Sequence, residues 1–205
     1  MQPEPPSRHI GFYQLFDAIQ QPGCPICRLA AWAIHRLLDS LFHGHVNDPG
    51  VREELRRAAG FCARHLGSAL RAGNPLGGSI IYGDLARHVA DHLDDKPPAA
   101  CPCCVSETTA AADAVATLIQ HLAEEDVRAA YEAGDGLCLP HLRQAFQQGG
   151  SSTRALLDQL EGAKLRRLAE ECEALVAKAD YQHIREELGT ERDAWKRAAR
   201  KLAGD

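Results

Sequence analysis

The sequence lacks the long apolar segments that membrane insertion and export require. Its 205 residues include no uninterrupted apolar run near the ~20 residues that a membrane-spanning helix needs. The first nine residues are polar and rich in proline, without the apolar core of a secretory signal. We therefore expect no membrane span, no export, and a cytoplasmic location in which cysteines stay reduced.

An excess of basic charge is also absent. The chain carries 23 Lys and Arg against 28 Asp and Glu, which gives a formal net charge of -5 at pH 7. Even the basic residues after Gly162 are interspersed with acidic ones. Because a nucleic-acid-binding protein usually presents a basic face, we expect no nucleic-acid partner.

Catalytic motifs and strand patterns are missing as well. We find no Ser-His-Asp order and no phosphate-binding loop, and the Gly-rich stretch 73–78 lacks the preceding strand and the lysine that such a loop needs. No convincing apolar alternation of period two occurs. The lack of strand patterns favours an all-α protein, and the lack of catalytic motifs favours one that is not an enzyme.

Two related cysteine patterns stand out against this background. Cys-x-x-Cys pairs, here called knuckles, occupy residues 24–27 and 101–104, and each begins Cys-Pro. Downstream of each knuckle, at residues 60–65 and 136–141, a glycine is followed two residues later by Cys and then by His three residues further on. Cys-x-x-Cys followed by Cys-x-x-His is ligand spacing for a metal, and the recurrence makes coincidence improbable.

The recurrence extends beyond the ligands. Cys24 and Cys101 are 77 positions apart and Cys62 and Cys138 are 76 apart, so the two halves align with a single one-residue gap. In this alignment Leu66 meets Leu142, Leu70 meets Phe146, and Gly73 meets Gly149 as a helix stop. We interpret the chain as a tandem duplication. The expected parts are a first metal-binding repeat (1–95), a second (96–180) and a C-terminal helical tail packing on them (181–205).

Apolar residues recur at helical spacing through both repeats. Helices are predicted near 12–19, 27–42, 48–60, 61–72 and 79–93, with Asp48 as an N-cap and Pro49 at the first helical position. The predicted fold is all-α, with tandem helical units each built around a Cys3His metal site.

Each expected site combines three thiolates and one imidazole. We assign each knuckle to the Cys/His helix of its own repeat, roughly 35 residues further on. The expected ligands are Cys24, Cys27, Cys62 and His65 in the first repeat, and Cys101, Cys104, Cys138 and His141 in the second. A complete tetrahedral shell of this kind leaves no position open for a substrate, which is typical of structural zinc.

Two Zn²⁺ ions are the favoured occupants. The alternative is two iron-sulfur clusters, which are also held mainly by Cys thiolates and would indicate electron transfer or redox sensing. A thioredoxin-type redox pair would need a βαβ context and no recurring His. A disulfide framework fits neither the expected compartment nor the His.

Two further sets of residues are weaker candidates. Cys103 occupies the position of Ile26 in the second knuckle; it is either an apolar filler or an accessory thiol that competes with Cys104 as ligand or handles metal. Asp84, His88 and His92 follow at i, i+4 spacing and form a third-site candidate, although a solvated helix face has the same pattern. Cys172 lies on an apolar stripe and is expected in the core.

The motifs resemble a family of bacterial proteins that share a domain of unknown function with tandem Cys-Pro-x-Cys and Gly-Phe-Cys-x-x-His motifs. The resemblance rests on both motif pairs and on residues 46–48, 81–85 and 195–197. It implies two bound metals in an α-helical protein and carries no known activity. The sequence thus favours a metal-binding interaction module or accessory subunit with a protein partner.

Overall fold

The computed structural model describes residues 8–96, 99–178 and 187–204, and these ranges contain helices and no strands. The all-α prediction is confirmed. None of the helices in these ranges combines the length and the apolarity that crossing a membrane would need. The expected boundary at 180/181 and the first residues of the expected C-terminal tail lie outside the described residues.

The chain divides into two compact units. We call residues 30–110 the inserted unit and residues 1–29 with 111–205 the flanking unit. Both boundaries fall inside helices, α2 (Pro25–Ser40) and α6 (Pro102–His121). Each unit therefore combines residues from both sequence repeats, so the units in space are not the repeats 1–95 and 96–180.

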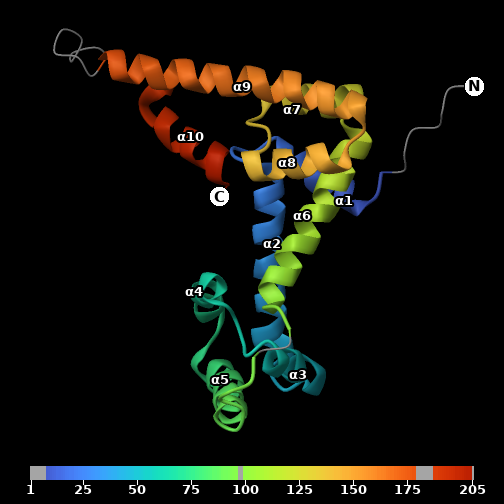
Figure 1. The fold of residues 1–205 in the computed structure, drawn as a ribbon, viewed down its shortest axis with the longest axis vertical. Coiled ribbons are helices and arrows are strands. Elements are labelled where there is room, and N and C mark those ends of the chain that lie inside the picture. Colours follow the sequence, from blue (N-terminus) through green and yellow to red (C-terminus); the bar gives the residue numbers. More distant parts are fainter. Residues whose placement is uncertain (1–7, 97–98, 179–186, 205) are drawn as a thin grey trace, which may run out of the picture. The chain divides into compact units, whose positions relative to one another are not determined.

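The flanking unit consists of the start of α2, the end of α6 and several further helices. These are α1 (Ile10–Ile19), α7 (Glu125–Ala133), α8 (Leu139–Gln148), α9 (Ser151–Lys178), the 3-10 helix η2 (Thr190–Asp193) and α10 (Ala194–Ala203). Helix α9 packs against α8 and α10, and α10 turns back beneath α9 toward α8 (Figure 1). The largest buried apolar side chains of the flanking unit are Leu15, Ile26, Leu118, Leu122, Tyr131, Leu137 and Leu157.

The inserted unit continues from α2 into a π-helical segment, η1 (Leu41–His45), and then into α3 (Pro49–Arg57), α4 (Ala63–Ala72) and α5 (Pro75–Ala90). Helix α5 packs against α3 and η1. The buried core consists of Leu38, Leu41, Phe42, Leu55, Ala69, Ile81, Leu85, Cys101 and Cys103. Two of these core residues belong to the second knuckle, so the knuckle is part of the packing of this unit.

Helix starts follow the capping signals in the sequence. The Asp48 side chain accepts a hydrogen bond of 2.9 Å from the Val51 backbone N–H, as expected for an N-cap before Pro49. Helix α5 starts at Pro75, earlier than the expected 79, because Asn74 accepts from the Gly77 N–H at 2.8 Å and caps it. The Gly-rich stretch is therefore partly the first turn of α5.

A glycine in the left-handed region precedes each Cys/His helix. Gly60 has φ of 85° and Gly136 has φ of 72°, and each lies two residues before the cysteine that caps α4 or α8. Because side chains are unfavourable at such φ, the repeated glycine fixes how the chain enters each ligand-bearing helix.

Two Gly→Ala substitutions in the inserted unit should change its stability in opposite directions. Gly60→Ala forces a side chain into the left-handed region and brings its Cβ to 3.1 Å from Leu85 Cδ1, so we expect a loss of about 1–2 kcal/mol. Gly83→Ala lies within α5, where the new Cβ meets nothing closer than Arg87 Nη1 at 4.0 Å. It should gain about 0.5–1 kcal/mol through helix propensity. Urea unfolding of both variants measures the difference, and a Gly60→Ala protein as stable as wild type would contradict the prediction.

Candidate metal centres

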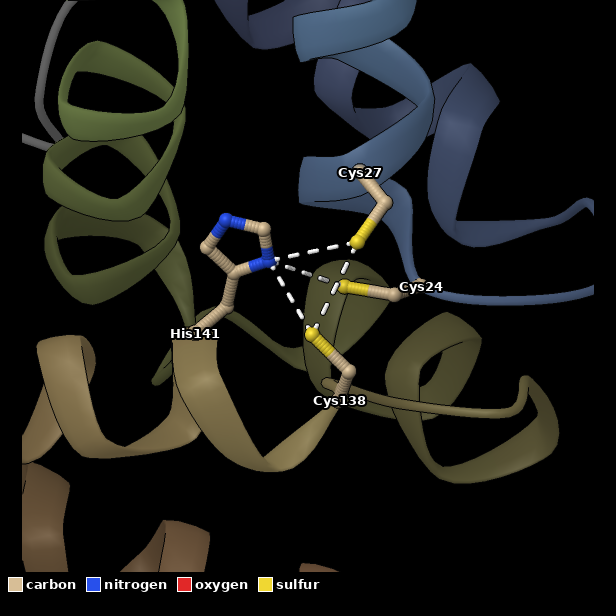
Figure 2. A group of neighbouring side chains, drawn as sticks. All are labelled: Cys24, Cys27, Cys138 and His141. Carbon is tan, nitrogen blue, oxygen red and sulfur yellow. Dashed lines mark hydrogen bonds between the residues drawn. The ribbon is translucent and has the colours of Figure 1, made fainter. Parts of the chain in front are cut away.

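The flanking unit gathers four predicted ligands into what we call the first group: Cys24, Cys27, Cys138 and His141. The three sulfur atoms face one ring nitrogen, Nδ1 of His141, at 3.6, 3.4 and 3.1 Å for Cys24, Cys27 and Cys138 (Figure 2). The sulfurs of Cys27 and Cys138 are 3.6 Å apart. The group could hold a metal ion.

The inserted unit gathers the other four into the second group: Cys62, His65, Cys101 and Cys104. His65 again presents Nδ1, which lies 3.4, 3.7 and 3.4 Å from the sulfurs of Cys62, Cys101 and Cys104. The sulfurs of Cys62 and Cys104 are 3.6 Å apart, as in the first group. Both groups therefore have the same ligand types in the same arrangement.

The expected assignment of each knuckle to its own repeat is wrong. The knuckle of the first repeat meets the Cys/His helix of the second, and the knuckle of the second repeat meets the Cys/His helix of the first. Helix lengths explain this crosswise assembly. Helix α2 has 16 residues, about 24 Å, whereas α3 has nine, about 14 Å. Helix α2 carries the chain away from Cys27, and α3 is too short to carry it back to the level of Cys27.

The atom spacings fit one tetrahedral ion in each group. Zinc with bonds of about 2.3 Å to sulfur and about 2.0 Å to nitrogen separates two sulfurs by about 3.8 Å and a sulfur from a nitrogen by about 3.5 Å. The sulfurs of Cys27 and Cys138 and those of Cys62 and Cys104 are 3.6 Å apart, and the sulfur–nitrogen distances span 3.1–3.7 Å. All ligand atoms of a group lie within 4.8 Å of one another. The donor set and its spacing thus match a single ion.

Helix N-termini surround both groups. Cys138 and Cys62 are the N-caps of α8 and α4, and Cys27 and Cys104 lie in the first turns of α2 and α6. Unpaired N–H groups and the positive ends of helix dipoles favour thiolates there. The His65 backbone N–H, together with neighbouring groups, lowers the pKa of Cys62.

In the first group the cysteine thiols and the His141 ring shift one another's pKa values. Hydrogen bonds from the thiols of Cys138 and Cys27 lower the pKa of Cys24. Burial lowers the pKa of His141, but its hydrogen bonds with Cys138 and Cys24 outweigh burial and raise it to about 9. The ring therefore stabilises negative charge on the sulfurs, which is the charge that a bound cation would neutralise.

Contacts that need no metal hold the two loops of the first group together. Before the knuckle, the Gly23 N–H donates to the Asp135 carboxylate at 2.7 Å, which joins it to the loop before Cys138. Glu161 on α9 is 1% exposed and accepts hydrogen bonds from the Tyr131 hydroxyl and, at 2.8 Å, from the Leu137 N–H. The loop that carries Cys138 is thereby fixed from two sides.

A buried ion pair completes this support. Lys201 on α10 donates to Glu161 at 2.5 Å and to the Asp135 carbonyl at 2.6 Å. At the end of α10, a Cβ placed on Gly204 would lie 3.7 Å from the sulfur of Cys138 and 3.8 Å from that of Cys27. The end of α10 therefore lies over the sulfurs of Cys138 and Cys27.

The second group has a different polar neighbour. Glu107 on α6 lies 3.5 Å from Nε2 of His65, the ring nitrogen that faces away from the sulfurs. Glu107 also accepts from Arg64 at 2.6 Å, and Arg64 approaches the Cys104 sulfur at 3.6 Å. A carboxylate on the second nitrogen of a ligand histidine fixes the ring and its tautomer.

The remaining cysteines lie outside both groups. The structure places Cys104 in the second group, whereas Cys103 is fully buried in the core of the inserted unit. Burial raises the pKa of Cys103 to about 12, so its thiol stays protonated. Cys172 is half-buried on α9 rather than fully buried.

The third-site candidate is not gathered into one group. Asp84 pairs with Arg52 at 2.7 Å and with Arg56 at 2.9 Å, and these arginines lower its pKa to about 2. His88 and His92 lie ring against ring, with centroids 4.5 Å apart. Asp84 thus has a structural role between α3 and α5.

Glu161 and Glu107 were not recognised from the sequence. Glu161 left a signal, because it occupies the position of the core residue Leu85 in the aligned repeats. A charge at a core position indicates a buried polar network. Glu107 follows Cys104 by three residues, one helical turn, but its position alone does not distinguish it from a solvated residue.

Comparison with known proteins gives a family and no activity. Residues 9–99 and 95–205 match the model of a family of unknown function, DUF6062. An uncharacterized 23.9 kDa protein in the xynA 3' region of Caldicellulosiruptor sp. (strain Rt8B.4) is 25% identical over 204 residues, 93% of this chain and 99% of that protein. No solved structure matches the chain. The two successive matches fit the tandem duplication.

Paired Cys→Ser substitutions test the crosswise assembly. Replacing Cys27 and Cys138 removes two ligands from the first group only, so the protein should keep one metal equivalent after exposure to excess chelator. Replacing Cys27 and Cys62 takes one ligand from each group, and both ions should then be lost. Metal analysis of the desalted proteins measures the outcome.

Cys172→Ser is the matched control for these variants and should keep two equivalents, because Cys172 lies outside both groups. If each knuckle instead shared a site with the Cys/His helix of its own repeat, the expected metal contents would be reversed. One equivalent would remain in the Cys27/Cys62 protein and none in the Cys27/Cys138 protein.

Proposed function

The chain belongs to this family of unknown function, and we propose that it is a non-enzymatic interaction module held together by two structural zinc ions. The observation that carries the proposal is the pair of Cys3His groups, whose ligand atoms are spaced for one tetrahedral ion each. Zinc is the ion for which three thiolates and one imidazole form a common closed shell.

The spacing favours zinc over an iron-sulfur cluster. Two ligands of one ion cannot be further apart than its two bonds end to end, about 4.6 Å for sulfur ligands. Ligands on different irons of a cluster are separated by an iron–iron edge in addition to those bonds. The distances of 3.1–3.7 Å between these sulfur and nitrogen atoms therefore support a single ion in each group.

The closed shell supports a structural role. In the first group zinc would be held by Cys24, Cys27, Cys138 and His141, and in the second by Cys62, His65, Cys101 and Cys104. When bound, the ion supplies a cross-link between the N-termini of two helices, α2 with α8 or α4 with α6. All four positions are filled by protein, so no substrate or water needs to bind the metal.

The surroundings of the groups support a reducing compartment. No disulfide joins any of the eight cysteines, all of which lie in the described part of the chain, and the sulfurs of Cys27 and Cys138, like those of Cys62 and Cys104, are 3.6 Å apart. Free thiols around metal sites are usual in the cytoplasm and unusual outside it. We therefore propose a cytoplasmic location and a role as a scaffold or accessory subunit for a protein partner.

Metal analysis and spectroscopy test the zinc assignment. Protein purified without oxygen should contain two zinc ions per chain and be colourless. Replacing zinc by Co²⁺ should produce visible bands of tetrahedral cobalt with thiolate charge transfer. Removing the metal should lower helicity by circular dichroism, and adding zinc should restore it, because metal binding and folding are coupled.

A brown protein that contains iron and sulfide and loses absorbance on reduction would overturn the zinc proposal. Metal-free protein that keeps its full helicity and its unfolding midpoint would overturn the structural role instead. Cys103→Ser serves as the matched control and should retain two equivalents, because this thiol lies outside both groups.

A further inference from the structure

The two Cys/His helices differ in how they are covered. Helix α8 packs against both α9 and α10, and Leu142 on it is only 6% exposed. The close helix pairs of the inserted unit are α3 with α5 and α5 with η1, and neither includes α4, within the described part of the chain. The residue of α4 that aligns with Leu142 is Leu66, and it is 38% exposed.

The same difference recurs at two other aligned positions. Leu70 on α4 is 59% exposed, whereas its counterpart Phe146 on α8 is half-buried. Cys62 is half-buried and its counterpart Cys138 is buried. One side of α4, with His65 and Ala69, packs into the core, so Leu66 and Leu70 at i, i+4 form a separate outward stripe.

The duplicate of α4 packs against a helix that the first repeat lacks. In the second repeat the cover includes α10, an amphipathic helix whose end lies over the sulfurs of Cys27 and Cys138. The first repeat is followed directly by the second knuckle and so has no counterpart of α10. The α4 stripe therefore lacks a helix that its duplicate has.

Charge indicates the chemistry of the missing helix. Residues 61–83 include Arg64 and Arg71 and no Asp or Glu. The Arg64 side chain is 63% exposed beside Glu107, and Arg71 donates to the Ser68 hydroxyl and pairs with no carboxylate within the described residues. An apolar stripe with basic edges fits an acidic amphipathic helix.

The same charges argue against a second copy of this chain. Two α4 helices packed together would place arginines opposite arginines, which is destabilising. Helix α10 of another copy carries four basic residues, Lys196, Arg197, Arg200 and Lys201, and no acidic one. Both homotypic arrangements thus bring like charges together.

We infer that the outward stripe of α4, centred on Leu66 and Leu70, is the docking surface for an acidic amphipathic helix of a partner protein. This inference rests on the proposed role as an interaction module and specifies its partner. Apolar residues of the partner helix pack on the leucines at i, i+3 or i+4 spacing, and its carboxylates meet Arg71 and the exposed edge of Arg64.

A labelled synthetic helix of about 18 residues, with a Leu stripe flanked by Glu, is a suitable probe because shorter peptides form helices poorly. A second peptide with Lys in place of every Glu tests the charge requirement. Fluorescence anisotropy with the full, metal-loaded chain measures both. We expect Leu70→Glu to weaken binding of the acidic peptide at least tenfold and Arg71→Glu to reverse the preference between the peptides.

Ile10→Glu is the matched control, since Ile10 is 77% exposed but lies on α1 of the flanking unit, and its binding should equal that of wild type. No binding, equal binding by the Leu70→Glu protein, or equal affinity for both peptides would overturn the inference. A dimer in sedimentation that Leu70→Glu abolishes would assign the stripe to a second copy and overturn it too. Metal content of the same samples separates failure of this surface from failure of the zinc sites.

Discussion

The structure depends on crosswise closure of two ligand groups. Each group joins the N-terminus of a helix from one repeat to the N-terminus of a helix from the other, so neither repeat contains a complete site. Residues 30–110 hold one group and the remainder of the chain holds the other. Because both halves must be present to complete either group, the two repeats form one interdependent chain rather than two independent metal-binding domains.

The ligand types and the helical class could be predicted from the sequence, because spacing and periodicity are local properties. Cys-x-x-Cys at a helix start and Cys-x-x-His across a helix N-cap place ligands side by side whatever the rest of the chain does. The repeat alignment favoured Cys104 over Cys103 as a ligand, since Cys103 matches the buried Ile26, but it left the choice open.

The partner of each knuckle could not be predicted in this way. Both Cys/His helices offer the same ligands. Which of them a knuckle joins therefore depends on helix lengths and on contacts between residues distant in sequence. The hydrogen bond from Gly23 to Asp135 joins segments 112 residues apart, and the network around Glu161 joins α7, α9 and α10. None of these contacts produces a periodic pattern in the sequence. Only Glu161, a charged residue at a position that is apolar in the other repeat, indicates the network.

The repeats have diverged mainly in their surroundings. One group is covered by the end of α10, and the other is bordered by the Arg64–Glu107 pair and by an open helix face. Similar ligand groups therefore lie in two units whose surfaces differ. Such divergence is expected where one copy keeps a structural cover and the other becomes free to meet a partner.

The crosswise tetrahedral groups are the central claim, and cadmium-substituted protein tests them most directly. Proton–¹¹³Cd correlation spectra link each bound ion to the side chains that ligate it. Crosswise assembly predicts two cadmium signals, one coupled to Cys24, Cys27, Cys138 and His141 and the other to Cys62, His65, Cys101 and Cys104. A single signal coupled to Cys24, Cys27 and Cys62, or coupling of Cys103 to either ion, would contradict it.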